Sequence, residues 1–168
     1  HAHLVRLASP ILLEHELTTL KELGSDFQVA TVSTLFEPNA GPESLELALN
    51  RVCYEAITAI DRGAHLLLLS DRGVSPQYAS IPMLLAVGAV NQHLVRHRKR
   101  MRASLLVETG EAFEVHHLAC LIGYGATAVT PYLAFETALM LADNNQVDPR
   151  EAVSTYRASL NKGLLKVM

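Results

Sequence analysis

Charged and polar side chains directly follow a short apolar segment near the middle of the chain. Residues 65–69 read His-Leu-Leu-Leu-Leu, and they are followed by Ser70, Asp71, Arg72 and Gly73. An apolar run that ends at charged residues and a glycine predicts a buried strand with polar side chains at its carboxyl end. In parallel α/β sheets, ligands bind at that end. Asp71 and Arg72 could therefore clamp a ligand, or they could form a structural ion pair or a turn closed by Gly73.

Polar residues also follow the other predicted strands, and together with Asp71 and Arg72 they could line one concave surface. These residues are Ser33, Thr34, Glu108, Thr109, Thr130 and Tyr132. No nucleophile among them has an obvious base beside it in the sequence, and neither a nucleophile elbow nor a phosphate-binding loop is present. Two alternatives stay open on these residues. One is a small enzyme that uses Asp71, Glu108 or His116 for acid–base chemistry, and the other is a module that binds a small anion through Arg72.

Two pairs of histidines have spacings that bear on metal binding. His116 and His117 are adjacent, so on a helix their side chains point about 100° apart and cannot face one metal. His93 and His97 have the spacing that zinc enzymes use, but no nearby glutamate completes that motif. We therefore expect no metal site, and we keep His116 and His117 as candidate contacts of the strand-end rim or of an interdomain surface.

Two further motifs have simple structural interpretations. The basic residues between Arg96 and Arg102 fall mostly in the last turn of a predicted helix, where cations complement the helix dipole. Residues 123–128 (Gly-Tyr-Gly-Ala-Thr-Ala) match a dinucleotide-binding pattern with alanine at the third glycine. That pattern must follow a strand and open a helix, whereas here it follows a helix and opens a strand. Gly123 as a helix C-cap explains it.

The bulk composition fits one domain over residues 1–168 and excludes several classes of partner. Hydrophobic residues make up 49% of the chain and charged residues 18%, which indicates surface meant for a protein neighbour. The net charge of −3 and the absence of tryptophan argue against nucleic acid. The longest apolar stretch, 81–90, is too short to span a membrane. With only Cys53 and Cys120, a reducing cytoplasm fits.

Hydrophobic periodicity predicts an α/β fold made of four successive strand–helix units. The predicted strands are 28–33, 65–69, 103–107 and 126–129, and the predicted helices after them are 42–63, 80–98, 111–122 and 131–142. The short connections require parallel pairing through crossover helices, which gives either an open sheet or half of an eightfold barrel. Flanking helices are predicted over 10–23 and 149–162.

Several blocks of residues, in order along nearly the whole chain, resemble the glutamate synthase large subunit, ferredoxin- or NADPH-dependent. They are 67–73 (LLLSDRG), 81–87 (IPMLLAV), 108–111 (ETGE), 115–117 (VHH), 121–126 (LIGYGA) and 131–134 (PYLA), with 7–11 (LASPI) and 163–168 (GLLKVM) at the ends. The matching region is the later part of the central domain. Because the apolar tail carries no stop signal, we expect both ends to be cut from a longer chain.

The resemblance implies a place within a larger oxidoreductase of glutamate biosynthesis. In that family a glutaminase domain releases ammonia, and an FMN-binding barrel joins the ammonia to 2-oxoglutarate. The central domain connects the two, and ammonia travels between them inside the protein. The implied partners are therefore the glutaminase and FMN domains of the same parent chain, with possible self-association through exposed interdomain surface. This segment would hold the spacing of its neighbours and contribute wall to the ammonia route.

The resemblance also implies what this segment lacks. The family's glutaminase nucleophile is an N-terminal cysteine, but the chain begins with His1 and its first cysteine is Cys53. The family's three-iron cluster needs three cysteine ligands, and two cysteines cannot supply them. FMN and an iron–sulfur cluster are thus implied for the parent enzyme and not for this segment. We assign no catalytic, cofactor-binding or metal residue here and expect no activity from the segment alone.

Overall fold

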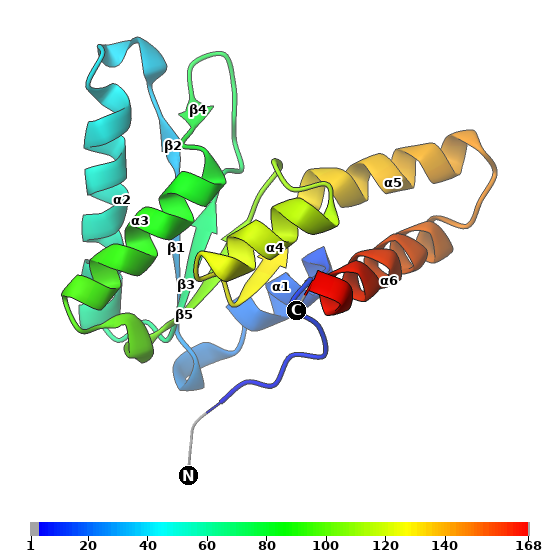
Figure 1. Cartoon of the computed structure of the whole chain (residues 1–168), viewed down its shortest axis with the longest axis horizontal. Coiled ribbons are helices and arrows are strands. Elements are labelled where there is room, and N and C mark those ends of the chain that lie inside the picture. Colours follow the sequence, from blue (N-terminus) through cyan, green and yellow to red (C-terminus); the bar gives the residue numbers. More distant parts are fainter. Residues whose placement is uncertain (1–3, 168) are drawn as a thin grey trace.

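A computed structural model describes residues 4–167, and a four-stranded parallel sheet lies at its centre (Figure 1). The strands lie side by side in the order β1 (Val29–Ser33), β3 (Leu66–Ser70), β5 (Ser104–Glu108) and β6 (Ala128–Thr130). Their register pairs Ser33 with Ser70, Ser70 with Glu108, and Glu108 with Thr130. The four strands therefore end level with one another. The predicted parallel α/β sheet is confirmed.

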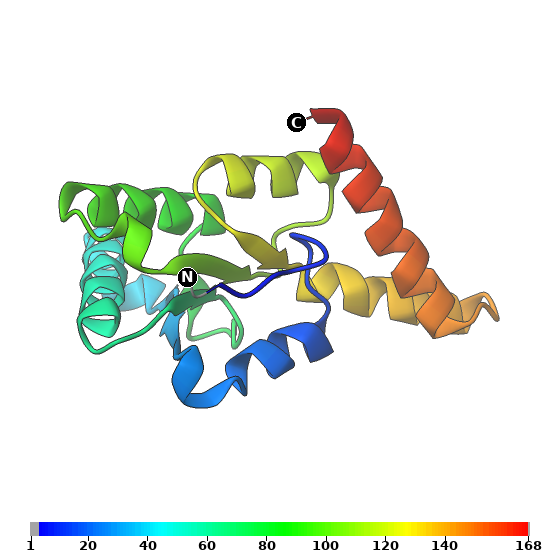
Figure 2. The same ribbon diagram turned by 90° about the horizontal axis from the view of Figure 1, so that it is seen from below.

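The crossover helices cover one face of this sheet, and a single short helix covers the other (Figure 2). The crossovers are α2 (Ser44–Asp61), α3 (Met83–Arg96) and α4 (Val115–Gly123), whereas α1 (Glu14–Lys21) lies on the opposite face. Consecutive strand order with all crossovers on one face is the arrangement of half a (β/α)8 barrel. The sheet stays open, and α1 packs on the face that would point into a barrel.

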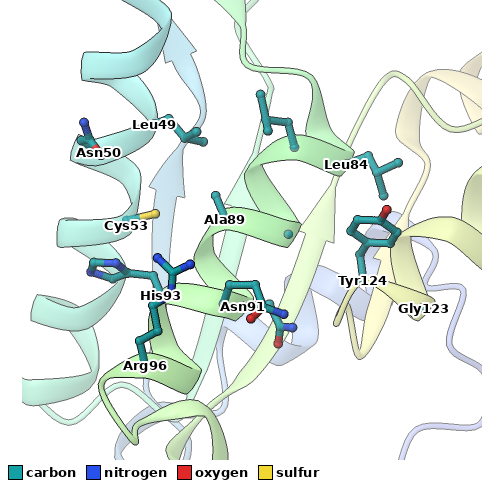
Figure 3. A pocket seen from close by; sticks show the side chains of 13 residues that line it. Leu49, Asn50, Cys53, Leu84, Ala89, Asn91, His93, Arg96, Gly123 and Tyr124 are labelled. Atoms are coloured by element: carbon teal, nitrogen blue, oxygen red, sulfur yellow. The ribbon is translucent and has the colours of Figure 1, made fainter.

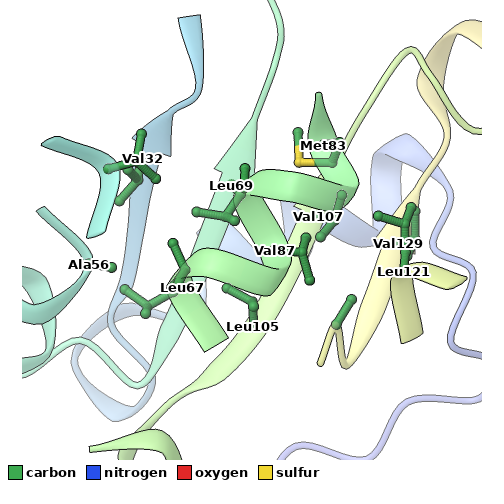
Figure 4. Close-up of a cluster of buried hydrophobic side chains, with 14 of the residues drawn as sticks. Val32, Ala56, Leu67, Leu69, Met83, Val87, Leu105, Val107, Leu121 and Val129 are labelled. Atoms are coloured by element: carbon green, nitrogen blue, oxygen red, sulfur yellow. The ribbon is translucent and has the colours of Figure 1, made fainter. Parts of the chain in front are cut away.

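The two faces of the sheet bury alternate residues of the same strands. Leu67, Leu69 and Val107 belong to the large core beneath α2, α3 and α4 (Figure 4). Leu68 and Leu106 point the other way, into a smaller cluster with α1. Burial on both faces explains why these strands are continuous apolar runs and do not alternate with polar residues.

The last two helices, α5 (Tyr132–Asn144) and α6 (Pro149–Val167), form an antiparallel hairpin that extends to one side of the sheet (Figure 1). The hairpin is attached through α6, which crosses α4 so closely that a Cβ on Gly163 would overlap Val115. Helix α6 also contacts the N-terminal segment. Ser9 Oγ donates to Asn161 Oδ1 at 2.8 Å, and Arg157 pairs with Glu16 at 3.0 Å.

Several predicted element boundaries are wrong. Helix α1 begins at Glu14 and not at Pro10, because the preceding segment adds to the edge of the sheet. Val129 N donates to Pro10 O at 2.8 Å, and Leu12 N donates to Val129 O at 2.9 Å. Helix α4 starts at Val115 and not at residue 111, and α6 continues to Val167. Helix α2 begins near its predicted start, and Gly63, with a φ of 99°, follows its end as expected.

Short elements absent from the prediction connect the larger ones. A two-stranded antiparallel sheet and three 3-10 turns are present: β2 (Leu35–Phe36), β4 (Ala79–Ser80), η1 (Gly24–Asp26), η2 (Pro38–Ala40) and η3 (Arg100–Arg102). None of the helices in the part of the chain that the structure describes is long and apolar enough to cross a membrane.

The basic run also differs from its prediction as a solvated helix end. Helix α3 ends at Arg96, so most of the run follows the helix. Arg100 donates to Asn91 Oδ1 at 2.5 Å and to the carbonyl oxygen of Gly125 at 2.8 Å. Gly125, with a φ of 123°, supplies the left-handed residue after α4, and Gly123 instead lies inside that helix. Arg100 therefore links α3 to the turn before β6.

Candidate functional site

The level ends of the four strands bring polar side chains together at one edge of the sheet. Backbone pairing continues one residue past three strands, because Thr34 N donates to Ser70 O, Asp71 N to Glu108 O, and Thr109 N to Thr130 O. Five of the predicted site residues meet there. We call them the strand-end cluster, and they are Asp71, Arg72, Glu108, Thr130 and Tyr132.

Asp71 is buried and joins three separate segments of the chain. Its carboxylate accepts a hydrogen bond from Thr109 Oγ1 at 2.6 Å and from Gly110 N at 3.0 Å. Tyr132 donates its hydroxyl to the same carboxylate. Burial, together with the Asp71 charge and this hydrogen bond, raises the pKa of Tyr132 to about 12. Tyr132 is therefore a neutral donor at physiological pH.

Glu108 is only 4% exposed, and protein groups compensate its charge. One carboxylate oxygen accepts from Ser70 Oγ at 2.6 Å, and the other accepts from Arg72 Nε at 2.7 Å. Lys21 Nζ on α1 approaches the second oxygen at 3.9 Å. Burial of a carboxylate is costly unless such partners compensate it.

Arg72 is the centre of the ion pairs at this edge. Besides Glu108 it contacts Glu14 of α1 at 2.6 Å and Glu136 of α5 at 3.6 Å, and its guanidinium lies 4.1 Å from the centre of the Tyr132 ring. Partial burial alone would lower the pKa of Arg72, but the hydrogen bonds and charges of Glu108 and Glu14 outweigh it and raise the pKa. The guanidinium thus joins β3, β5, α1 and α5.

This geometry favours the structural ion pair over the ligand clamp that the sequence left open. Each carboxylate oxygen of Asp71 and Glu108 accepts a hydrogen bond from a protein group. With Glu14 and Glu136 included, acidic groups around Arg72 outnumber basic ones. A phosphate, including that of a flavin, would meet net negative charge here. These residues therefore do not fit FMN.

Thr130 differs from its neighbours in the strand-end cluster. Its residue is 1% exposed, and its Oγ1 is buried without a hydrogen-bond partner. Among the side chains that the structure describes, this is the one buried oxygen or nitrogen in that state. Its register partner is Glu108. Thr130 contributes packing to the edge, while its hydroxyl stays unpaired.

The remaining predicted site residues, His116 and His117, lie elsewhere, on α4. His117 Nδ1 accepts a hydrogen bond from Phe113 N at 3.2 Å, and His116 Nε2 lies 3.6 Å from Cys120 Sγ. Both histidines line a cavity of about 280 Å³ between α4, the start of α3 and the loop that precedes α4. The structure therefore separates them from the strand-end cluster.

Metal-ligating side chains do not converge in the described part of the chain. No group of three or more His, Cys, Asp or Glu residues there could hold a metal ion. The two cysteines lie apart, with Cys53 on α2 and Cys120 on α4. The rings of His93 and His97 are 4.3 Å apart, and burial followed by the charges of His97 and Arg96 lowers the pKa of His93. The thiolate set of an iron–sulfur cluster does not fit this chain alone.

Two larger hollows lie away from the strand-end carboxylates. One, of about 610 Å³, runs between α2 and α3, with Cys53 and His93 on its wall and Tyr124 at its far side (Figure 3). The other, of about 590 Å³, lies between α1, α5 and α6, and Phe135 and Val153 contribute to its mainly apolar wall. The second hollow reaches Tyr132, so it adjoins the outer side of the strand-end cluster.

Sequence reasoning missed three partners of the strand-end cluster, namely Glu14, Lys21 and Glu136. Glu136 lies one helical turn after Tyr132, so once Tyr132 was placed at the edge, the spacing could have indicated it. Glu14 and Lys21 approach because α1 packs across the sheet, and the local sequence carries no signal for that placement.

Comparison with known proteins gives a consistent result over the full length. Residues 1–168 match the family model described as the glutamate synthase central domain. The chain is 39% identical to ferredoxin-dependent glutamate synthase 2 of Synechocystis, over 99% of this chain and 12% of that protein. It is 41% identical to the glutamate synthase [NADPH] large chain of Bacillus subtilis, over 98% of this chain and 11% of that protein. Glutamate synthase [NADH] of Schizosaccharomyces pombe is 37% identical, with coverages of 98% and 8%.

Proposed function

This chain belongs to the glutamate synthase central domain family, and we propose that it is a non-catalytic connecting domain of a longer glutamate synthase polypeptide. It spans between 8% and 12% of the length of the relatives described above. In the proposal, residues 1–168 form one domain that holds the glutaminase and FMN-binding domains at a fixed spacing. The domain also forms part of the wall of an internal ammonia route.

The observation that carries this proposal is that the polar side chains at the strand ends pair with other groups of the same domain. The strand-end carboxylates are committed to Arg72, Ser70 and Thr109 and do not surround an open cavity. Polar groups that are saturated in this way rigidify a domain and leave little capacity for acid–base chemistry. A rigid edge suits a domain whose role is to keep two neighbours at a set distance.

Exposed apolar side chains on the α5–α6 hairpin support a protein neighbour. We call them the apolar hairpin face, and they are Leu133, Leu139, Met140, Leu141, Val147, Leu165 and Val167. Met140 is 67% exposed and Leu165 is 80% exposed. Exposed apolar side chains on a projecting hairpin are typical of surface that another part of a protein covers. Self-association of the isolated domain would use the same surface.

The relatives differ in the electron donor that they use. They include ferredoxin, NADH and NADPH enzymes, and the identities all lie between 37% and 41%. The domain is therefore common to enzymes with different electron donors, as expected for a part that does not contact the donor. FMN and an iron–sulfur cluster would be bound by other domains of the parent chain. A cytoplasmic location stays a prediction from the two cysteines.

The experiment measures coupling in the full-length enzyme. Met140→Glu, made together with Leu165→Glu, would place charge on the apolar hairpin face and loosen the contact with the neighbouring domain. We expect the glutamate formed per glutamine hydrolysed to fall, while glutamate formation from added ammonia is retained. Asn144→Glu, an exposed change on the same hairpin, is the control. An unchanged ratio in the double variant would contradict the proposal.

A second measurement tests the non-catalytic part. Purified residues 1–168 should form no glutamate from glutamine or from ammonia, and detection of that activity would overturn the proposal. The small-anion alternative predicts that phosphate or 2-oxoglutarate raises the melting temperature of the domain. We expect no shift with either ligand, because Arg72 already contacts three carboxylates.

A further inference from the structure

Cys120 and His116 form a nucleophile–base pair that the connecting role does not use. The two residues lie one turn apart on α4, and Cys120 Sγ is 3.6 Å from His116 Nε2. That distance is within hydrogen-bonding range for sulfur, so a neutral imidazole in this position can accept the thiol proton. A thiol with an adjacent base is the arrangement that activates cysteine as a nucleophile.

The second cysteine of the chain provides an internal contrast. Cys53 is 7% exposed and packs in the large core on α2. Burial raises the pKa of the Cys53 thiol, which disfavours the reactive thiolate. Cys120 is only partly buried and has an imidazole in contact. The same chain thus holds one thiol that is 7% exposed, on the wall of the hollow between α2 and α3, and one thiol that is more exposed and in contact with an imidazole.

Cys120 also faces a space that can admit a small reagent. The cavity of about 280 Å³ is lined by Met83, Leu84 and Leu121 in addition to the pair itself. Its other titratable groups, on the loop before α4 and on α4, have partners. Glu111 accepts from Met83 N and Ser80 Oγ, and His117 Nδ1 accepts from Phe113 N. His116 is the lining base in contact with the sulfur, and the mainly apolar wall favours an uncharged reagent.

We propose that Cys120 is a site of reversible thiol modification by small uncharged disulfides, with His116 as the proton acceptor. His116 Nε2 takes the thiol proton, and Cys120 Sγ attacks one sulfur of the disulfide. The new Sγ–S bond forms as the S–S bond of the reagent breaks, and the released thiolate takes up one proton. One protein thiol and one disulfide give one mixed disulfide and one small thiol. This inference is independent of the connecting role.

The test uses 4,4′-dithiodipyridine, a neutral disulfide whose released thiopyridone is measured by absorbance. At about pH 7.5 the intact protein should react at Cys120 at least about tenfold faster than at Cys53, with the modified residue identified by peptide mass spectrometry. Cys120→Ser should abolish the fast phase, and Cys53→Ser should leave it unchanged. A Cys53 that reacts as fast as Cys120 in the folded protein would overturn the proposal.

The role of the imidazole is tested separately. His116→Gln should slow Cys120 about fivefold at pH 7.5, and the two rates should converge near pH 10, where thiols ionise without a base. His117→Gln, on the same turn, should leave the rate unchanged. Protection of Cys53 in each variant reports that the fold is intact. An equal rate for His116→Gln and the unmodified protein at pH 7.5, with Cys53 still protected, would refute the role of His116.

Discussion

The strand-end cluster and the apolar hairpin face differ in how their side chains are used. At the strand ends, Asp71 and Glu108 are buried, and their carboxylates are held by Thr109, Gly110, Ser70 and Arg72. On the hairpin, Met140 and Leu165 are exposed, and no other segment within residues 4–167 covers them. The region that resembles a catalytic rim in sequence is internally closed, and the region without chemical motifs is open to a neighbour.

This difference shows that residue type alone does not locate function. A carboxylate at the end of a parallel strand has the position of a catalytic group, but its partners decide whether it is available. Here Glu108 is saturated by Ser70 and Arg72, so the charge stabilises the fold. The contrast predicts large effects on stability from changes at the edge and small effects from changes on the hairpin surface.

The largest expected effect comes from Glu108→Ala. This change leaves Ser70 and Arg72 without their buried acceptor, and we expect the free energy of unfolding to fall by about 3 kcal/mol. Met140→Ser should change it by less than about 0.5 kcal/mol, because that side chain is exposed. Urea denaturation of both variants measures the difference. Equal losses would remove the distinction between the two regions.

A smaller effect is expected where the hairpin joins the body. Gly163→Ala would force a methyl group against Val115 at the α4–α6 crossing, and we expect a loss of about 2 kcal/mol in the free energy of unfolding. The matched control is Gly123→Ala in α4, where nothing lies within 4 Å, and which should be neutral or stabilising by up to about 1 kcal/mol. If thermal melts show no difference between the two, the hairpin is not held by this contact.

The smallest effect is expected from Tyr132→Phe. The ring against Arg72 is kept, and loss of the hydrogen bond to Asp71 should cost about 1 kcal/mol. The pKa of folded Tyr132 is about 12, against an ordinary value of 10.0. The unfolded chain therefore loses the Tyr132 proton first, so this contribution is complete below pH 10 and declines as pH rises towards 12.

The measurement that checks this is the free energy of unfolding from pH 9 to about pH 12. The decline assigned to Tyr132 should be absent in the phenylalanine variant. Tyr54→Phe, at an exposed tyrosine, is the control and should leave the decline in place. A wild-type profile identical to that of Tyr132→Phe would show that Asp71 does not hold the Tyr132 proton.

Local sequence signals were sufficient to predict the sheet and most of the polar residues at the ends of its strands. The apolar run at 65–69 and the polar residues after it placed Asp71, Arg72 and Glu108 together, because parallel strands end at one edge. The long-range partners could not be predicted in this way. Glu14 reaches Arg72 across 58 positions of sequence, and only the packing of α1 on the sheet brings the two together.

Tertiary packing decides two positions that the local sequence leaves open. His116 is predicted at the strand-end rim or at an interdomain surface, and it lies exposed on α4 beside Cys120. Pro10 is a good first residue of a helix, yet its carbonyl oxygen accepts a hydrogen bond from Val129 N in the sheet. At Pro10 a tertiary contact therefore overrides a valid local preference.

The contacts that join the N-terminal segment to α6 determine how the domain would carry tension. A pull applied at Ser9 and Asn161 would first load the hydrogen bond between those residues and then the nearby pair of Glu16 and Arg157. The force would pass directly between these two segments, and the hydrogen bonds of β3 and β5 would lie outside its path. Under such a pull, the Ser9–Asn161 and Glu16–Arg157 contacts would break first, while the sheet stays folded.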